Sequence, residues 1–170
     1  MTVKGSLCNL CDADGVVRLV LQGEKYREAE HVFFTWKVRA VVDQGLFGLP
    51  PGSQIQGLDS GILFDLLDFA VQIRSLPATS RAILTGEYQS IRIEVEPREG
   101  LPVAMVTLRD PFPLAKDDLA ECIKETWELQ PQGRRVYSEM KLGFCTREDL
   151  LVEFAASLED LHERLMSEPV

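Results

Sequence analysis

Two cysteines near the start of the chain, Cys8 and Cys11, have the C-x-x-C spacing found in zinc and redox sites. A structural zinc site needs four ligands, and the sequence contains no second C-x-x-C pair and only two histidines, which are distant from each other. A redox pair opens a helix after a strand, whereas the residues that follow, 12–15 (Asp-Ala-Asp-Gly), are typical of a hairpin turn. We therefore predict strand cysteines beside a turn, with neither a metal nor a cofactor.

The sequence supports nucleophilic or acid–base catalysis no more strongly than it supports a metal or redox site. A Cys–His pair would require the fold to bring Cys8, Cys122 or Cys145 to His31 or His162, and nothing in the sequence places a thiol beside an imidazole. Two carboxylates that are two positions apart on a strand are neighbours on one face. An acid catalyst needs burial to raise its pKa, whereas the alternation of the strand puts such pairs on the face toward solvent. Glycine-rich phosphate loops and hydrolase motifs are absent. We expect no enzymatic activity.

Composition points to one globular domain over residues 1–170, with 45% hydrophobic and 26% charged residues. Lys and Arg number 18 against 27 Asp and Glu, which gives a net charge of −9. Nucleic acid and anionic membranes are bound by clustered cations, so this balance argues against both and fits a basic protein partner. There is no signal-peptide core and no run of 18 apolar residues, which predicts a cytoplasmic protein.

The elements that would position any site begin with strands. Residues 16–21 are rich in strand formers, and a polar connection is expected over 24–30. From His31 the residues alternate, with Thr35, Lys37 and Arg39 on the polar side of a long strand. Residues 45–57 suggest an irregular turn. Residues 91–95 and 103–108 predict a hairpin around 97–100, and residues 136–144 predict a further strand.

Two amphipathic helices are expected to pack on these strands. Asp59 or Ser60 can cap the first, over residues 61–76, while Thr146 and Asp149 resemble a capping box before a closing helix that ends near Met166. Residues 110–130 are compatible with either a helix or a strand. We predict an α+β fold with one curved, mainly antiparallel sheet of about six or seven strands and two long helices on it.

The order of these elements carries a family resemblance. A leucine-rich helix is followed by the link Gly86-Glu87-Tyr88 and an I-x-I-x-V hairpin. A late strand then enters residues 141–144 (Lys-Leu-Gly-Phe), residues 146–150 and a final helix. Over residues 16–165 the pattern resembles the small acidic immunity proteins of bacterial polymorphic toxin systems, especially the wall-associated-protein immunity type and related uncharacterised actinobacterial families. That resemblance implies stoichiometric binding of a cognate toxin domain, often basic and often a nuclease. We expect the chain itself to be a monomer or a homodimer.

Two other classes stay open at this point. An acidic secretion chaperone has a similar length and charge, and a small-ligand-binding or enzymatic domain would need a pocket with convergent polar groups. For a basic protein partner, the predicted binding residues are exposed carboxylates on the second hairpin and after it. Reversing the charge of such residues is expected to change stability by only about ±0.5 kcal/mol. They are Glu94, Glu96, Glu99, Asp117, Asp118 and Glu121.

Overall fold

The computed structural model describes residues 2–42, 52–76, 80–109, 112–113 and 139–169, which form two antiparallel sheets and two helices. The first sheet has the order β1-β2-β3-β4-β8 and the second the order β5-β6-β7-β9. The α+β class is confirmed, but the prediction of a single curved sheet of about six or seven strands is wrong, and only one of the two predicted long helices is long. The strands of the first sheet are β1 (Thr2–Cys11), β2 (Val17–Glu28), β3 (His31–Val41), β4 (Gln54–Ser60) and the two-residue β8 (Phe112–Pro113).

The four-stranded sheet consists of β5 (Ala82–Thr85), β6 (Ile91–Glu96), β7 (Val103–Arg109) and β9 (Glu139–Cys145). Its central hairpin confirms the second predicted hairpin, because β6 alternates between buried and half-buried residues as expected. The chain leaves β4 for a helix and returns as β5, which pairs with β6 and not with β4. Alternation identifies a strand and its buried face, but it does not identify the partner strand, which explains the error.

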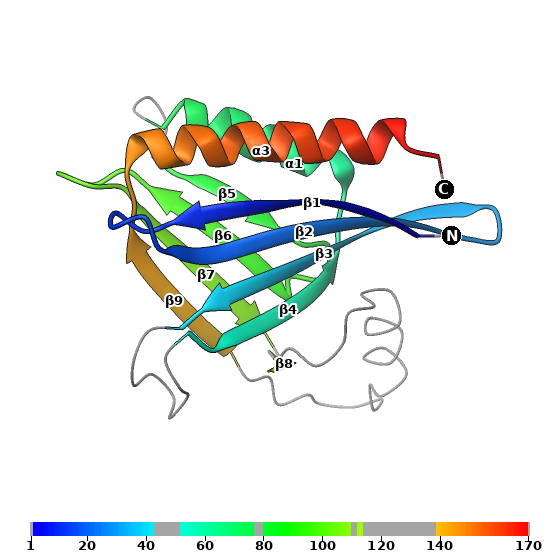
Figure 1. The fold of residues 1–170 in the computed structure, drawn as a ribbon, viewed down its shortest axis with the longest axis horizontal. Helices are drawn as coiled ribbons and strands as arrows, with labels where there is room; N and C mark the ends of the chain where they lie inside the picture. The colour runs from blue at the N-terminus through cyan, green and yellow to red at the C-terminus, as the bar shows by residue number, and fades with distance from the viewer. Residues whose placement is uncertain (1, 43–51, 77–79, 110–111, 114–138, 170) are drawn as a thin grey trace.

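The two sheets share one hydrophobic core and lie one behind the other, with their strands crossing (Figure 1). Gly57 on β4 packs closely against the second sheet, since a Cβ added there would lie 2.9 Å from Leu108 Cδ2 on β7. Trp36 on β3 is fully buried, and Gly61 leaves the room that its indole ring needs. Both glycines are therefore required by packing between segments that are distant in sequence.

Both helices lie along one side of the sheets (Figure 1) and close it. Helix α1 (Leu63–Arg74) packs against β5, and α3 (Glu148–Ser167) packs against α1 and β1. Side-chain bonds join the helices to the sheet edges: Gln72 Oε1 accepts the Ile83 N–H at 2.8 Å, and Cys8 Sγ donates to the Ser157 carbonyl at 3.2 Å. We call α1 and α3 together the helical layer.

Neither predicted helix cap is present. Asp59 is a buried residue of β4, and its carboxylate accepts backbone N–H groups of Tyr88, Ser90 and Ile91 at 2.7 to 3.2 Å. Burial raises the pKa of Asp59, although these donors oppose the rise. Asp59 thus ties β4 to the turn before β6. The N-cap positions are Ile62 and Arg147, neither of which has a side-chain cap bond.

Three further predictions about local structure differ from what the structure shows. Thr146 donates its hydroxyl to the Cys11 carbonyl at 2.8 Å, so it joins the ends of β1 and β9 and does not form a capping box. The expected polar connection at 24–30 belongs mostly to β2, which continues to Glu28. The segment expected to be irregular, 45–57, contains the first part of β4. The predictions for residues 43–51, 114–130 and 136–138 lie outside the described residues.

Candidate functional site

The cysteines and histidines that the structure describes do not assemble a chemical site. Burial raises the pKa of Cys8 to about 11, which keeps its thiol protonated and makes it a poor ligand or nucleophile. Within the described ranges, no three His, Cys, Asp or Glu side chains are grouped closely enough to hold a metal ion. His162 is buried in α3, with its ring 5.9 Å from that of Phe64. Cys122 lies outside the described residues.

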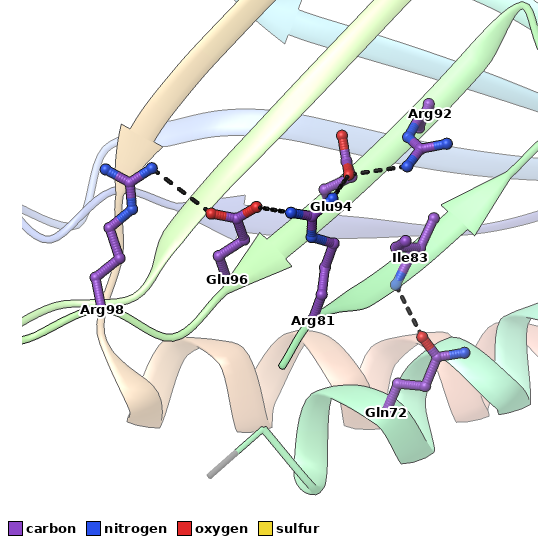
Figure 2. A network of polar contacts seen from close by, with 7 residues as sticks. All are labelled: Gln72, Arg81, Ile83, Arg92, Glu94, Glu96 and Arg98. Carbon is purple, nitrogen blue, oxygen red and sulfur yellow. Dashed lines mark hydrogen bonds and ion pairs between the residues drawn. The ribbon is translucent and has the colours of Figure 1, made fainter. Parts of the chain in front are cut away.

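The predicted partner-binding residues of the hairpin lie among arginines on the outer face of the four-stranded sheet (Figure 2). Glu94 pairs with Arg81 at 3.1 Å and with Arg92 at 3.0 Å. Glu96 pairs with the same Arg81 at 2.7 Å and with Arg98 at 3.6 Å. Strand geometry makes this possible, because residues two apart share a face and Arg81 immediately precedes the neighbouring strand β5. We call these five residues the arginine–glutamate network.

This network neutralises the charge on which the prediction depended. Hydrogen bonding from Arg92, helped by the charges of Arg92 and Arg81, lowers the pKa of Glu94 although partial burial opposes the change. Its side chain is only 12% exposed. Two carboxylates face three guanidinium groups here, so the surface is not acidic. Glu99 is exposed in the following turn, and Asp117, Asp118 and Glu121 lie outside the described residues.

The helical layer, by contrast, is strongly acidic. Its two helices contain eight carboxylates and two arginines, a formal charge of −6 out of the chain's −9. One of the arginines, Arg74 on α1, forms a two-point contact with Glu159 on α3, at 3.1 and 2.9 Å. Asp68, Asp160 and Glu163 are exposed. Most of the chain's excess negative charge therefore lies on this one layer.

Apolar side chains are exposed on the same layer. Phe64 is 66% exposed and Val71 is 59% exposed, and their spacing of seven residues puts them on one stripe of α1 with Asp68 between them. On α3, Val152 and Met166 are about half exposed. Large apolar side chains exposed together, with charged residues around them, are typical of protein-binding surfaces.

One end of the helical layer is hollowed into a pocket of about 300 Å³. The end of α1, the start of α3 and the base of the β6–β7 hairpin form its wall, and its lining is mainly apolar with one arginine and one glutamate. This volume accommodates one apolar side chain of a partner. The lining residues are Ile73, Arg74, Leu76, Pro97, Pro102, Glu148, Leu151 and Val152.

Sequence reasoning missed the helical layer as a candidate site, although a signal for it was present. The predicted helices contained far more acidic than basic residues, whereas the strand Glu residues attracted attention because their outward alternation was clear.

Comparisons of the chain with protein-family models, with curated proteins and with solved structures gave no match. Among the described residues, no helix is long and apolar enough to cross a membrane.

Proposed function

We propose that the chain is a non-enzymatic, cytoplasmic binding protein that neutralises a basic bacterial toxin domain by stoichiometric binding. The resemblance in element order suggests this role. The observation that carries the docking surface is the helical layer, which combines a charge of −6 with exposed apolar side chains. The arginine–glutamate network is not part of the proposed docking surface.

The two components of the layer would act at different stages of binding. Exposed carboxylates such as Asp160 and Glu163 attract a basic partner over about 10 Å at 0.1 M salt and so raise the association rate. Phe64 and Val71 can then be desolvated in the complex, which slows dissociation. Charge complementarity also suppresses binding of acidic proteins, which would make the layer selective in a cell.

A nuclease domain is the class of toxin that best suits this surface. Its substrate is a polyanion, so its active-site cleft contains clustered Lys and Arg side chains. The carboxylates of α3 recur along the exposed side of a 20-residue helix, and they can contact such cations in place of phosphates. Inhibition then follows from occupation of the cleft, without any chemical step in the inhibitor.

The proposal is tested by co-expressing the chain with the product of the neighbouring gene and measuring mass, toxicity and association rate. A one-to-one complex that abolishes toxicity supports it. The double variant Asp160→Lys/Glu163→Lys should slow association by at least about tenfold at low salt. The matched variant Glu96→Lys/Glu99→Lys, with the same change in charge, should slow it less than about twofold.

The possible results separate the function from the surface. If no complex forms and toxicity persists, the neutralising role is wrong. If a complex forms but the variant of the hairpin slows association more than the variant of α3, the partner binds the hairpin predicted from the sequence. Measured again at high salt, the effect of Asp160→Lys/Glu163→Lys should shrink, because salt screens the steering interaction.

A further inference from the structure

β9 is the last strand of the four-stranded sheet, so one of its edges faces away from β7 (Figure 1). The phase of the pairing follows from Thr146, which comes directly after β9 and donates its N–H to the Pro102 carbonyl at 2.9 Å. Backbone groups alternate in direction along an antiparallel strand, and those of Thr146 face β7. The alternate set, Cys145, Gly143 and Lys141, therefore turns its N–H and C=O groups away from β7.

Most of this outer edge is open within the described residues. The Cys145 carbonyl accepts the Ala13 N–H at 2.9 Å, which confirms its outward direction and closes the edge at that end. No hydrogen bond to the outward groups of Gly143 or Lys141 is found in the described part of the chain. The helical layer covers two other edges, because Gln72 of α1 binds a backbone N–H of β5 and α3 packs against β1. An open row of N–H and C=O groups is a template for another extended backbone.

A pocket of about 320 Å³ lies along the open edge of β9. Its lining includes the consecutive residues 142–145, and consecutive strand residues point to opposite faces, so the pocket follows the edge and not one face. The turn between β1 and β2, the start of β2 and the end of β3 form the other walls. These walls consist of Asp12, Ala13, Asp14, Arg18 and Val41. None of the lining residues belongs to α1 or α3, so this surface is separate from the helical layer.

The pocket walls suit a long side chain with a positive end. The apolar part of the wall consists of Val41, Leu142 and Phe144. Asp12 is already paired, because its carboxylate accepts Arg18 Nε at 2.7 Å and two backbone N–H groups of its own turn. Asp14 is exposed, and the nearby Arg147 is held by a two-point contact with Asp149 at 3.1 and 3.0 Å. A lysine side chain can lay its methylene groups on the apolar wall and its ammonium group at Asp14.

We infer that the outer edge of β9 binds an extended, lysine-containing segment of another protein as an added strand, with the lysine side chain in the pocket. Main-chain hydrogen bonds to Gly143 and Lys141 provide the affinity, and the pocket provides the specificity. Because the β1–β2 turn closes the edge at Cys145, the open part is short, which suits a peptide better than the edge of a second folded copy. The inference does not depend on the proposed function, because it uses no part of the helical layer.

Hydrogen exchange tests the open edge without any ligand. The amides of Gly143 and Lys141 face away from β7, so they should be protected at least about tenfold less than those of Leu142 and Phe144, which face β7. ¹H–¹⁵N NMR measures these rates, each divided by its intrinsic value. Equal protection would show that the outward amides already have partners in the protein and would overturn the inference.

The binding test titrates the capped peptide Thr-Val-Lys-Val-Thr, rich in strand formers, to millimolar concentration into ¹⁵N-labelled protein. The amide signals of Gly143 and Lys141 should shift and saturate. Two forms of the peptide, with alternate backbone nitrogens methylated in opposite phases, should differ in affinity by at least about tenfold, because one phase keeps the N–H groups that face β9. The absence of a saturable shift overturns the inference, and so does equal binding of the two methylated forms.

Variants of Gly143 test the edge from the side of the protein. Gly143→Pro removes an outward N–H and no bond to β7, so it should weaken peptide binding by at least about tenfold. Gly143→Ala keeps the N–H and should bind as wild type does, since an added Cβ would lie 3.9 Å from the Ala104 carbonyl oxygen, an ordinary contact. A wild-type dimer that Gly143→Pro makes monomeric would assign the edge to a second copy and would overturn the inference.

A variant of Asp14 tests the side-chain pocket. Asp14→Asn should weaken binding of the lysine peptide about two- to fivefold, the factor that corresponds to an exposed ion pair. The same variant should leave binding of a peptide with norleucine in place of lysine unchanged. Glu99→Gln, an equal change of charge in the turn between β6 and β7, should alter neither affinity. Equal effects of Asp14→Asn on both peptides would mean that the lysine side chain does not reach this pocket.

Discussion

The helical layer and the outer face of the four-stranded sheet both contain carboxylates that are at least partly exposed, but only the helical layer is acidic. On the sheet, Glu94 and Glu96 share three arginines in the arginine–glutamate network. On the helices, eight carboxylates accompany two arginines. A count of acidic residues therefore does not locate an acidic surface, because the neighbouring cations decide how much of the charge remains.

The geometry of each element explains the difference. Alternate residues of a strand share a face, so Arg92, Glu94 and Glu96 form a row, and Arg81 lies beside that row. On a helix the neighbours are three or four residues apart, and in α1 and α3 several of these neighbours have like charge. Asp65 and Asp68 are one example, and Glu159 and Glu163 are another. Such pairs destabilise a helix by a few tenths of a kcal/mol each.

The helical layer thus keeps several like-charged pairs that do not help it to fold, whereas the sheet uses its charges for local pairing. A surface that retains mutually repelling carboxylates beside exposed apolar side chains is more consistent with binding than with stability. This contrast is why the proposed docking surface is α1 and α3 and not the second hairpin. It also gives the two regions different expected responses to mutation.

The largest expected difference concerns charge reversal. Glu94→Lys removes two ion pairs and places a third cation between Arg81 and Arg92, so it should lower the free energy of unfolding by about 1–2 kcal/mol. The matched change Asp160→Lys on α3 should stay within about 0.5 kcal/mol, because it introduces a cation into an acidic surface. Urea unfolding of both variants at pH 7 measures this. Equal stabilities would mean that Glu94 is free in solution, as the sequence alone suggested.

A smaller effect is expected where the helical layer does form an ion pair. The two-point contact between Arg74 and Glu159 should give a coupling of about 0.5–1 kcal/mol in a double-mutant cycle of Arg74→Met and Glu159→Gln. The pair of Arg98 and Glu96, at 3.6 Å with Arg98 mostly exposed, should give a coupling near zero. A larger coupling for Arg98 and Glu96 than for Arg74 and Glu159 would contradict the view that contact geometry decides the strength of these ion pairs.

The predictions that succeeded from sequence are those set by one buried face. Alternation identified β3 and the β6–β7 hairpin, and helical spacing identified α1 and α3, because each of these elements buries a continuous apolar stripe. The pairing of strands into two sheets was not predictable in this way. β4 was missed for the same reason. The turn-rich run with Pro50, Pro51 and Gly52 suggested an irregular segment up to Gly57, whereas Gly57 packs closely against Leu108 of a distant strand.

The site predictions failed because they did not include the residues that strand pairing brings close to each side chain. The outward direction of Glu94 and Glu96 was right, but the position of Arg81 depends on the pairing of β5 with β6. Asp59 looked like a helix cap because it precedes α1, yet its backbone partners come from the turn before β6. The burial of Thr35 and Lys37, on the polar side of β3, likewise depends on what lies against the outer face of the five-stranded sheet, which alternation along one strand does not report.

The smallest expected effect concerns how the free energy of unfolding depends on pH, which should have opposite signs in the two regions. Pairing lowers the pKa of Glu94 below its ordinary value of 4.5, so the folded protein loses stability as pH falls through the folded-state value. Burial, together with the charge of Asp68, raises the pKa of Asp65 above 3.8, so the folded protein gains stability as pH falls through that range. In urea unfolding from pH 6 to pH 3, wild type should therefore lose stability relative to Glu94→Gln and gain it relative to Asp65→Asn, by a few tenths of a kcal/mol in each case. If both differences change in the same direction, the contrast between paired sheet carboxylates and repelling helix carboxylates does not hold.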